Sequence, residues 1–171
     1  HRVRKAFIVD SAGLDTARKL LRQRLLAMVG VQSCQLPLAE PRLIVQMWTG
    51  VVIHIHLIVS QAKTRSIKRV LQENTDVGIG TMFIVERPLL PDANLRLAVP
   101  EWLMALHALT YERIYAFALN AGDLVLSQLH FEPIGTSGDM GAKYGPAPKL
   151  DRLRFLRTAI KPRYIRGDWQ L

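Results

Sequence analysis

The sequence contains a single cysteine, Cys34, and few aromatic residues, which make up 7% of its 171 positions. One cysteine cannot form a disulfide within the chain, and it cannot supply the thiolates of a typical zinc module. Long apolar runs are also missing: the most apolar stretch, 43–59, is interrupted by Gln46, His54 and His56, whereas a spanning helix needs about 20 mostly apolar residues. We therefore expect a cytoplasmic protein of a reducing compartment, without a membrane segment.

Several motifs of common enzyme classes are absent from the sequence as well. It has no Walker A loop, no G-x-G-x-x-G opening a helix, no G-x-S-x-G and no H-E-x-x-H. Cys34 has no basic neighbour in the sequence that would stabilise a thiolate. These absences favour a role without catalysis, and they leave metal-dependent chemistry as the alternative considered below.

What the sequence does have is the composition of a packed domain. Apolar residues make up 49% of the chain, and the mean hydropathy is +0.11, which argues against global disorder. The length suits one domain. We expect an α/β core domain over 1–132, followed over 133–171 by a linker rich in Gly and Pro and a basic C-terminal extension.

Periodicity and turn residues predict the elements of this domain. Two apolar runs across Thr49-Gly50 predict a hairpin, and a helix between two strands predicts a parallel pair. The expected fold class is α/β, a single domain with a central mixed β-sheet flanked by helices. The predicted elements are a strand at 5–9, a helix at 14–28, a loop or short edge strand at 31–41, a hairpin over 43–59, a helix at 65–74, a strand at 79–85, a helix at 101–110, a second hairpin over 113–131 (or a helix continuing through 119), a linker at 135–148 and a short basic helix at 150–159.

The net charge of +9 is concentrated at the two ends of the chain. Residues 1–30 contain seven Lys or Arg and two Asp, residues 133–171 contain eight and three, and residues 31–132 contain eight against nine acidic residues. Basic ends on a neutral body are typical of proteins that contact phosphate backbones. The alternative is that these cations only solvate helix surfaces.

The leading hypothesis is a non-catalytic module that binds nucleic acid or another polyanion, or that assembles a nucleoprotein. In the C-terminal extension, four aromatic residues interleave with cations, which suits single-stranded or structured RNA. Another hypothesis is a structural subunit of a protein complex whose C-terminal tail binds a protein partner. The candidate nucleic-acid contacts are Arg18, Arg22, Lys63, Arg65, Lys68, Arg69, Arg152, Arg154 and Arg157.

His54 and His56 are the candidate metal ligands. Residues two apart in a strand project to the same face, and two neutral imidazoles can ligate a divalent metal. The segment His54-Ile55-His56 resembles the His–hydrophobe–His strand of the HUH nucleases and transposases. This resemblance implies a metal-dependent nuclease or nicking enzyme with Tyr111 or Tyr115 as the nucleophile. The alternative is a pair of half-buried polar residues that are hydrogen-bonded to neighbours.

Gln61 and Lys63 follow the same predicted strand, and residues 14–85 are expected to run helix, hairpin, helix, strand. This order, with Gln-x-Lys after the hairpin, resembles the core of the restriction-endonuclease-like PD-(D/E)xK superfamily. The family places a metal-binding Asp at the start of the hairpin's second strand, where this sequence has Val51 and Val52. The resemblance therefore implies a binding scaffold that has lost its catalytic metal.

Overall fold

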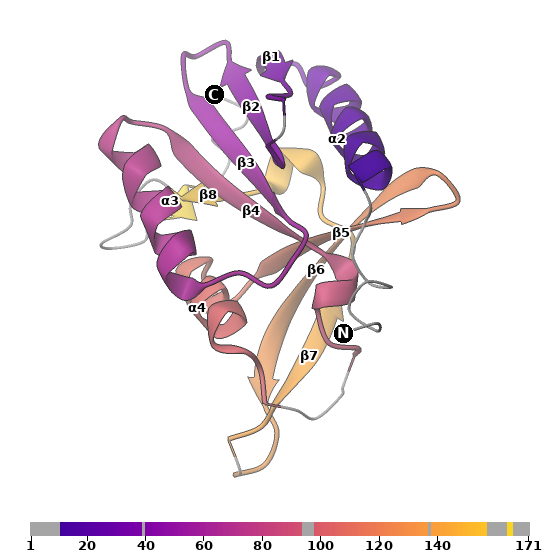
Figure 1. Ribbon diagram of the computed structural model, residues 1–171, viewed down its shortest axis with the longest axis vertical. Coiled ribbons are helices and arrows are strands. Elements are labelled where there is room, and N and C mark those ends of the chain that lie inside the picture. The colour runs from indigo at the N-terminus through magenta and orange to yellow at the C-terminus, as the bar shows by residue number, and fades with distance from the viewer. Residues whose placement is uncertain (1–10, 39, 94–97, 137, 157–163, 166–171) are drawn as a thin grey trace.

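A computed structural model describes residues 11–38, 40–93, 98–136, 138–156 and 164–165 (Figure 1). The strand expected at 5–9 and the candidate contact Arg157 lie outside these residues. A mixed sheet with the strand order β1-β2-β3-β4-β5-β6-β7 forms the centre of the molecule. Its strands are β1 (Val31–Gln35), β2 (Arg42–Met47), β3 (Val52–Ile58), β4 (Gly80–Glu86), β5 (Ile114–Asn120), β6 (Asp123–Pro133) and β7 (Met140–Gly145).

Helices cover both sides of this sheet (Figure 1). The helix α2 (Ser11–Leu26) packs on one side, while α3 (Thr64–Asp76) and α4 (Glu101–Leu109) pack together on the other. We call these the α2 side and the α3 side. Because side chains alternate along a strand, the odd-numbered residues of β3 are buried against α2, and its even-numbered residues face the α3 side. The expected fold class, one α/β domain with a mixed sheet and flanking helices, is confirmed.

The central part of the sheet follows the predicted order. β2 and β3 form an antiparallel hairpin, and β3 lies parallel to β4 after the chain crosses through α3. The predicted edge strand is β1, which among the described strands pairs only with β2. β3 lies between two neighbouring strands; its odd-numbered residues are buried, whereas Val52, His56 and Ile58 on the α3 side are only partly buried.

The second predicted hairpin is also confirmed, because β5 and β6 pair along their whole common length. Ala121 and Gly122 form its turn with φ values of 50° and 79°, and two successive left-handed residues are typical of a tight hairpin turn. A helix continuing from α4 through residue 119 is therefore wrong. In the described residues, no helix is both long enough and apolar enough to cross a membrane.

The predicted linker at 135–148 is wrong for its middle part, which is the strand β7. This strand pairs antiparallel with β6 from Pro133↔Met140 to Gln128↔Gly145. At Gly141, a Cβ would stand 2.6 Å from Cδ1 of Ile134. This glycine therefore lies in close contact with Ile134, which composition alone could not distinguish from linker flexibility.

The predicted basic helix at 150–159 is wrong over its described residues. Residues Leu150–Arg152 form a 3₁₀ turn, η2, and Phe155–Leu156 form a short strand, β8, which pairs with β4 and with β9 (Tyr164–Ile165). Leu153, Phe155 and Leu156 are all buried. Because Leu153 and Phe155 follow a two-residue period, this segment packs as an extended chain rather than as an amphipathic helix.

Candidate nucleic-acid interface

The helix α3 places its cations opposite its buried face. Ile67, Leu71 and Asn74 pack inward, and Asn74 donates a buried hydrogen bond of 2.9 Å to the hydroxyl of Thr81 on β4. With about 100° of rotation per residue, three cations fall within a sector of about 100° on the outer face. We use the name α3 basic face for these three and the residue at the N-cap, all exposed: Lys63, Arg65, Lys68 and Arg69.

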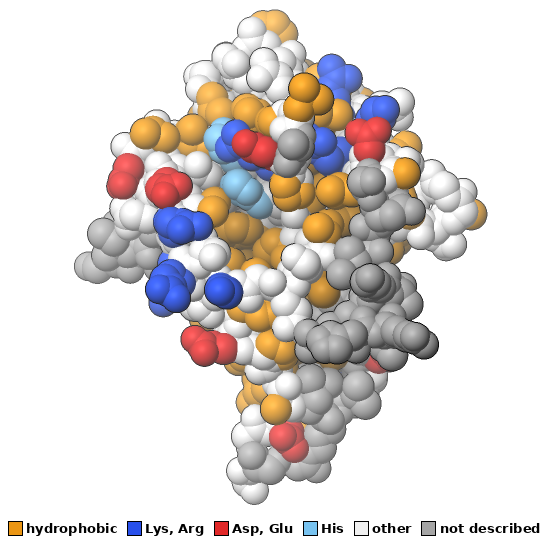
Figure 2. Space-filling model, viewed as in Figure 1, with side chains coloured by type: hydrophobic (Ala, Val, Ile, Leu, Met, Phe, Trp, Pro, Cys, Tyr) orange, Lys and Arg blue, Asp and Glu red, His pale blue; other side chains and the backbone are white. Residues whose placement is uncertain are grey.

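The α3 basic face lies at the end of the helix that least tolerates positive charge. The N-terminus of a helix carries a partial positive charge, which disfavours cations at the cap and in the first turn, here Lys63 and Arg65. The first turn of α3 has no acidic residue, and the side chain of Lys63 forms no cap hydrogen bond. Among the described residues, none of the four cations forms an ion pair. Figure 2 shows Lys and Arg side chains gathered over the first turns of this helix.

The cations of α2 serve the fold instead. Arg18 is buried, and its guanidinium donates to the carbonyl oxygens of Pro37 at 2.7 Å and Arg42 at 3.0 Å. Arg22 is exposed, but its Nε donates to the carbonyl of Cys34 at 2.7 Å. Both side chains therefore fasten α2 to the β1–β2 region. Because α2 and α3 cover opposite sides of the sheet, the structure does not bring these residues into the α3 basic face, and buried Arg18 is not available to a ligand.

Two further candidate contacts, Arg152 and Arg154, lie in the C-terminal extension. Arg152 is exposed on η2. Arg154 is half-buried, and its backbone N–H donates to the hydroxyl of Tyr115 at 3.2 Å. Arg2, Arg4, Lys5 and half of the cations of the C-terminal extension lie outside the described residues, so binding through the basic chain ends stays a prediction. The clearest cluster of cations comes from the middle of the chain, where the overall charge is balanced.

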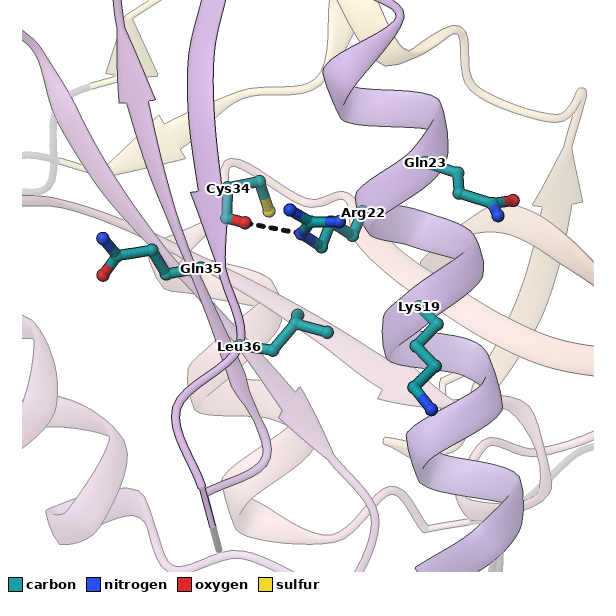
Figure 3. A pocket seen from close by; sticks show the side chains of 6 residues that line it. All are labelled: Lys19, Arg22, Gln23, Cys34, Gln35 and Leu36. Atoms are coloured by element: carbon teal, nitrogen blue, oxygen red, sulfur yellow. Dashed lines mark hydrogen bonds between the residues drawn. The ribbon is translucent and has the colours of Figure 1, made fainter.

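A hollow of about 530 Å³ lies between α2 and β1. Figure 3 shows Arg22 reaching from α2 toward the backbone of Cys34, with Lys19 also on the helix. Burial raises the pKa of Cys34 to about 11, although Arg22 and Arg18 act in the opposite direction. The thiol is therefore protonated near neutral pH, in agreement with the absence of a reactive thiolate expected from the sequence. This hollow offers cations and no nucleophile.

His54 and His56 project from β3 to the α3 side, with ring centroids 6.1 Å apart. Figure 2 shows histidine side chains on this face beside a basic and an acidic side chain. Burial lowers the pKa of both imidazoles, that of His56 to about 4, so both are neutral at pH 7. Nη1 of Arg42 lies 3.2 Å from Nδ1 of His54. Because a guanidinium can only donate, Nδ1 accepts, and the proton of neutral His54 is on Nε2.

This tautomer does not suit a metal ligand. A metal-bound histidine donates its second N–H to a carbonyl or carboxylate, whereas Arg42 occupies that position at His54. In the described part of the chain, no group of three or more His, Cys, Asp or Glu side chains lies close enough to hold a metal ion. Arg42 also forms an ion pair with Glu40. The arrangement supplies two nitrogens and a neighbouring cation, so a divalent metal at this position remains a prediction without geometric support.

Neither candidate tyrosine joins the histidine pair. Tyr115 is buried in the core of the α2 side, across the sheet from His54 and His56. Tyr111 follows α4 and lines a different hollow, which includes neither histidine. The structure therefore does not assemble the His and Tyr groups that the resemblance to HUH enzymes implies.

The Gln-x-Lys segment lies after the end of β3, not within it. Both Gln61 and Lys63 are exposed, and Lys63 is the N-cap of α3. Val51 and Val52 are partly buried at the start of β3. No carboxylate is present at these positions to hold a hard cation. The residue that sequence reasoning missed is Arg42, which lies one position before the predicted hairpin; extending the antiparallel pairing by one residue places Arg42 directly across from His56.

Comparison of the chain with protein-family models, with curated proteins and with solved structures gives no match.

Proposed function

We propose that the protein binds nucleic acid, and that it contacts the phosphate backbone through the α3 basic face. The supporting observation is that the cations of the α3 basic face repel one another in the free protein. Four exposed cations crowd the positive end of one helix, and none has a carboxylate partner among the described residues. A polyanion relieves both the repulsion among these cations and their repulsion by the helix dipole.

The contact is electrostatic and independent of sequence. The charges of α3 are separated along its length: the only acidic residues, Glu73 and Asp76, lie in its second half, and its first half carries only cations. Gln72 donates to the carboxylate of Asp76 at 2.6 Å, which also directs this acid along the helix. Along α3, positive potential is therefore highest at the beginning of the helix, where a phosphate also meets the positive end of the helix dipole.

Salt dependence of binding tests this proposal. Each phosphate contact adds about 0.7 to 0.9 to the slope of log affinity against log salt, so four contacts give a slope of about −3. We expect this slope for a fluorescently labelled oligonucleotide measured by anisotropy between low and moderate salt. Affinity that does not change with salt contradicts the proposal.

A matched pair of variants locates the contact. The double variant Lys68→Gln/Arg69→Gln should lose about 10- to 50-fold in affinity at 0.1 M salt, and its slope should fall by about 1.5. The control Lys19→Gln/Lys149→Gln removes the same charge from two exposed positions away from α3. If both double variants lose affinity equally, the α3 basic face is not the contact and only the net charge matters.

The restriction-endonuclease-like resemblance agrees with the same proposal as a scaffold that binds without cutting. The helix, hairpin, helix and strand occur in the order that it implies, and the site lacks the metal-binding acid. The prediction is that bound DNA or RNA remains uncut in the presence of Mg²⁺ or Mn²⁺. Metal-dependent cleavage that is lost in His54→Ala/His56→Ala would favour the nuclease alternative.

A further inference from the structure

The connection between α4 and β5 forms one wall of a second hollow. This hollow has a volume of about 370 Å³, within the range of about 300–1,000 Å³ typical of small-ligand sites. Its other wall comes from β6 and the end of β7. It is lined by Tyr111, Glu112, Arg113, Gln128, Leu129, His130, Gly145 and Pro146.

The backbone at this hollow is strained in a way that controls the position of an aromatic ring. Tyr111 and Glu112 have φ values of 53° and 62°. Left-handed backbone is unfavourable for side chains larger than Asn, and such strain concentrates at binding sites. The N–H of Glu112 donates to the carbonyl of His107 at 2.7 Å, which ties this turn to the last residues of α4. The turn leaves the side chain of Tyr111 51% exposed.

A buried histidine, His107, also supports the strained turn. The backbone N–H of Phe131 on β6 donates to Nε2 of His107 at 3.0 Å, and the rings of these two residues lie in edge-on contact with centroids 5.2 Å apart. Burial lowers the pKa of His107, so the imidazole is a neutral acceptor near pH 7. α4, the turn and β6 are thereby fixed relative to one another, and Tyr111 is held on a rigid base.

Charged and polar groups surround this ring. Arg113 is half-buried and forms no ion pair or hydrogen bond with its side chain in the described part of the chain. The amide nitrogen of Gln128 donates to the carbonyl of Pro146 at 2.9 Å, which leaves the amide oxygen as an acceptor. His130 is paired with Glu132 at 2.8 Å, so the carboxylate nearest to this histidine is already engaged. The exposed residue Tyr111, the guanidinium of Arg113 and the oriented amide of Gln128 therefore line one hollow.

We infer that this hollow holds one nucleotide of a single-stranded nucleic acid. The base stacks on the ring of Tyr111, the guanidinium of Arg113 contacts the phosphate, and the amide of Gln128 contacts the edge of the base. A stacked base in a duplex cannot enter such a hollow, so the ligand is single-stranded at this point. Stacking tolerates every base, because each has a π-face. The inference rests on the proposed function for the polymer, but it concerns residues outside the α3 basic face.

Binding of a labelled 12-nucleotide oligo-dT or oligo-U, compared with a duplex of the same length, tests this inference in the full chain. Tyr111→Ala should weaken binding of the single strand about 5- to 100-fold. Tyr111→Leu, which retains bulk without a π-face, should weaken it similarly, while Tyr111→Phe and Tyr111→Trp should retain it. Arg113→Gln should weaken binding and reduce the salt slope by about 0.7. Equal affinity in the wild type and all four Tyr111 variants overturns the inference.

Mononucleotides separate this result from the proposed function. AMP and UMP should shift the NMR signals of residues 111–113 and 128–130 in the wild type, and the shifts should be lost in Tyr111→Leu. If no oligonucleotide binds but AMP or UMP gives these shifts, the hollow is a nucleotide site and the proposed function fails. If oligonucleotides bind through the α3 basic face while the hollow residues give no shifts and Tyr111→Leu has no effect, the proposed function stands and this inference is overturned.

Discussion

The ring of Phe155 lies directly over Gly80. A Cβ at Gly80 would stand 2.5 Å from Cδ2 of Phe155, closer than real Cβ contacts allow. Gly80 begins β4, and Phe155 belongs to β8, which pairs with β4 at the next residue, Thr81↔Leu156. The missing side chain on one strand therefore makes room for the ring on the other. This contact joins the C-terminal part of the described chain to the central sheet.

Gly80→Ala should therefore destabilise the protein by about 1–3 kcal/mol, because the added methyl group overpacks a rigid site. The free energy of unfolding from urea titration measures the change. The control is Gly145→Ala, where a Cβ would stand 3.5 Å from Cγ of Gln128, an ordinary contact. The double variant Gly80→Ala/Phe155→Leu should recover part of the loss. Equal effects of the two single substitutions would show that the ring does not limit the site.

Arg18 should behave as a structural residue. Its guanidinium supplies hydrogen bonds to two backbone carbonyls, those of Pro37 and Arg42, and a buried acceptor that loses its donor costs about 1–3 kcal/mol. Arg18→Met retains the length of the side chain and removes the donors, so unfolding should become easier by about 2–4 kcal/mol. Lys19→Met, at an exposed neighbouring position, should change stability by less than about 0.5 kcal/mol. Folded Arg18→Met should bind nucleic acid with the affinity of the wild type. A loss of affinity in this variant would show that Arg18 contacts the nucleic acid.

Much of the fold was predictable because local patterns and tertiary packing agree. The two apolar runs and the turn residues of 43–59 predicted the β2–β3 hairpin, and the polar and apolar faces of 65–74 predicted α3. The C-terminal segment was predicted wrongly because its decisive contacts are distant in sequence. Nothing near Phe155 indicates that Gly80 leaves space for it. Composition also could not distinguish a Gly-rich linker from β7, where Gly141 lies in close contact with Ile134.

The candidate site was predictable only in part for the same reason. The cations of α3 are recognisable from helical spacing, because a single helix places them. Arg18 and Arg22 have the same spacing on α2, yet their partners lie on β1, on β2 and in the loop between these strands, so their roles follow from packing. The histidine pair was placed on one face correctly. The tautomer of His54 depends on Arg42 across the hairpin, which strand register reveals and residue types alone do not.

Acid should destabilise the protein through His56. Burial and the neighbouring His54 and Arg42 lower the pKa of His56 from 6.5 to about 4 in the folded state. Between these two values the unfolded chain binds more protons, so stability is complete above pH 6.5 and declines as the pH falls toward 4. The loss should reach roughly 1–3 kcal/mol. Urea titrations between pH 7 and pH 4 measure it, and His56→Gln should flatten the profile. A wild-type profile equal to that of His56→Gln would contradict the assigned burial.

Substituting glycine for Glu112, the residue that follows Tyr111 in the left-handed turn, should relieve the backbone strain of this turn. Glu112 has a φ of 62°, a conformation that glycine adopts without the steric cost that other residues meet. Glu112→Gly should therefore raise the free energy of unfolding by only about 0 to 1 kcal/mol, because the relief of strain is offset by the greater entropy of glycine in the unfolded chain. The same substitution at Glu73, an exposed position inside α3, should cost about 1 kcal/mol. Thermal or urea unfolding of the two variants gives the comparison. If the two substitutions destabilise the protein equally, the turn before β5 stores no strain, and Tyr111 is not held in place by its backbone.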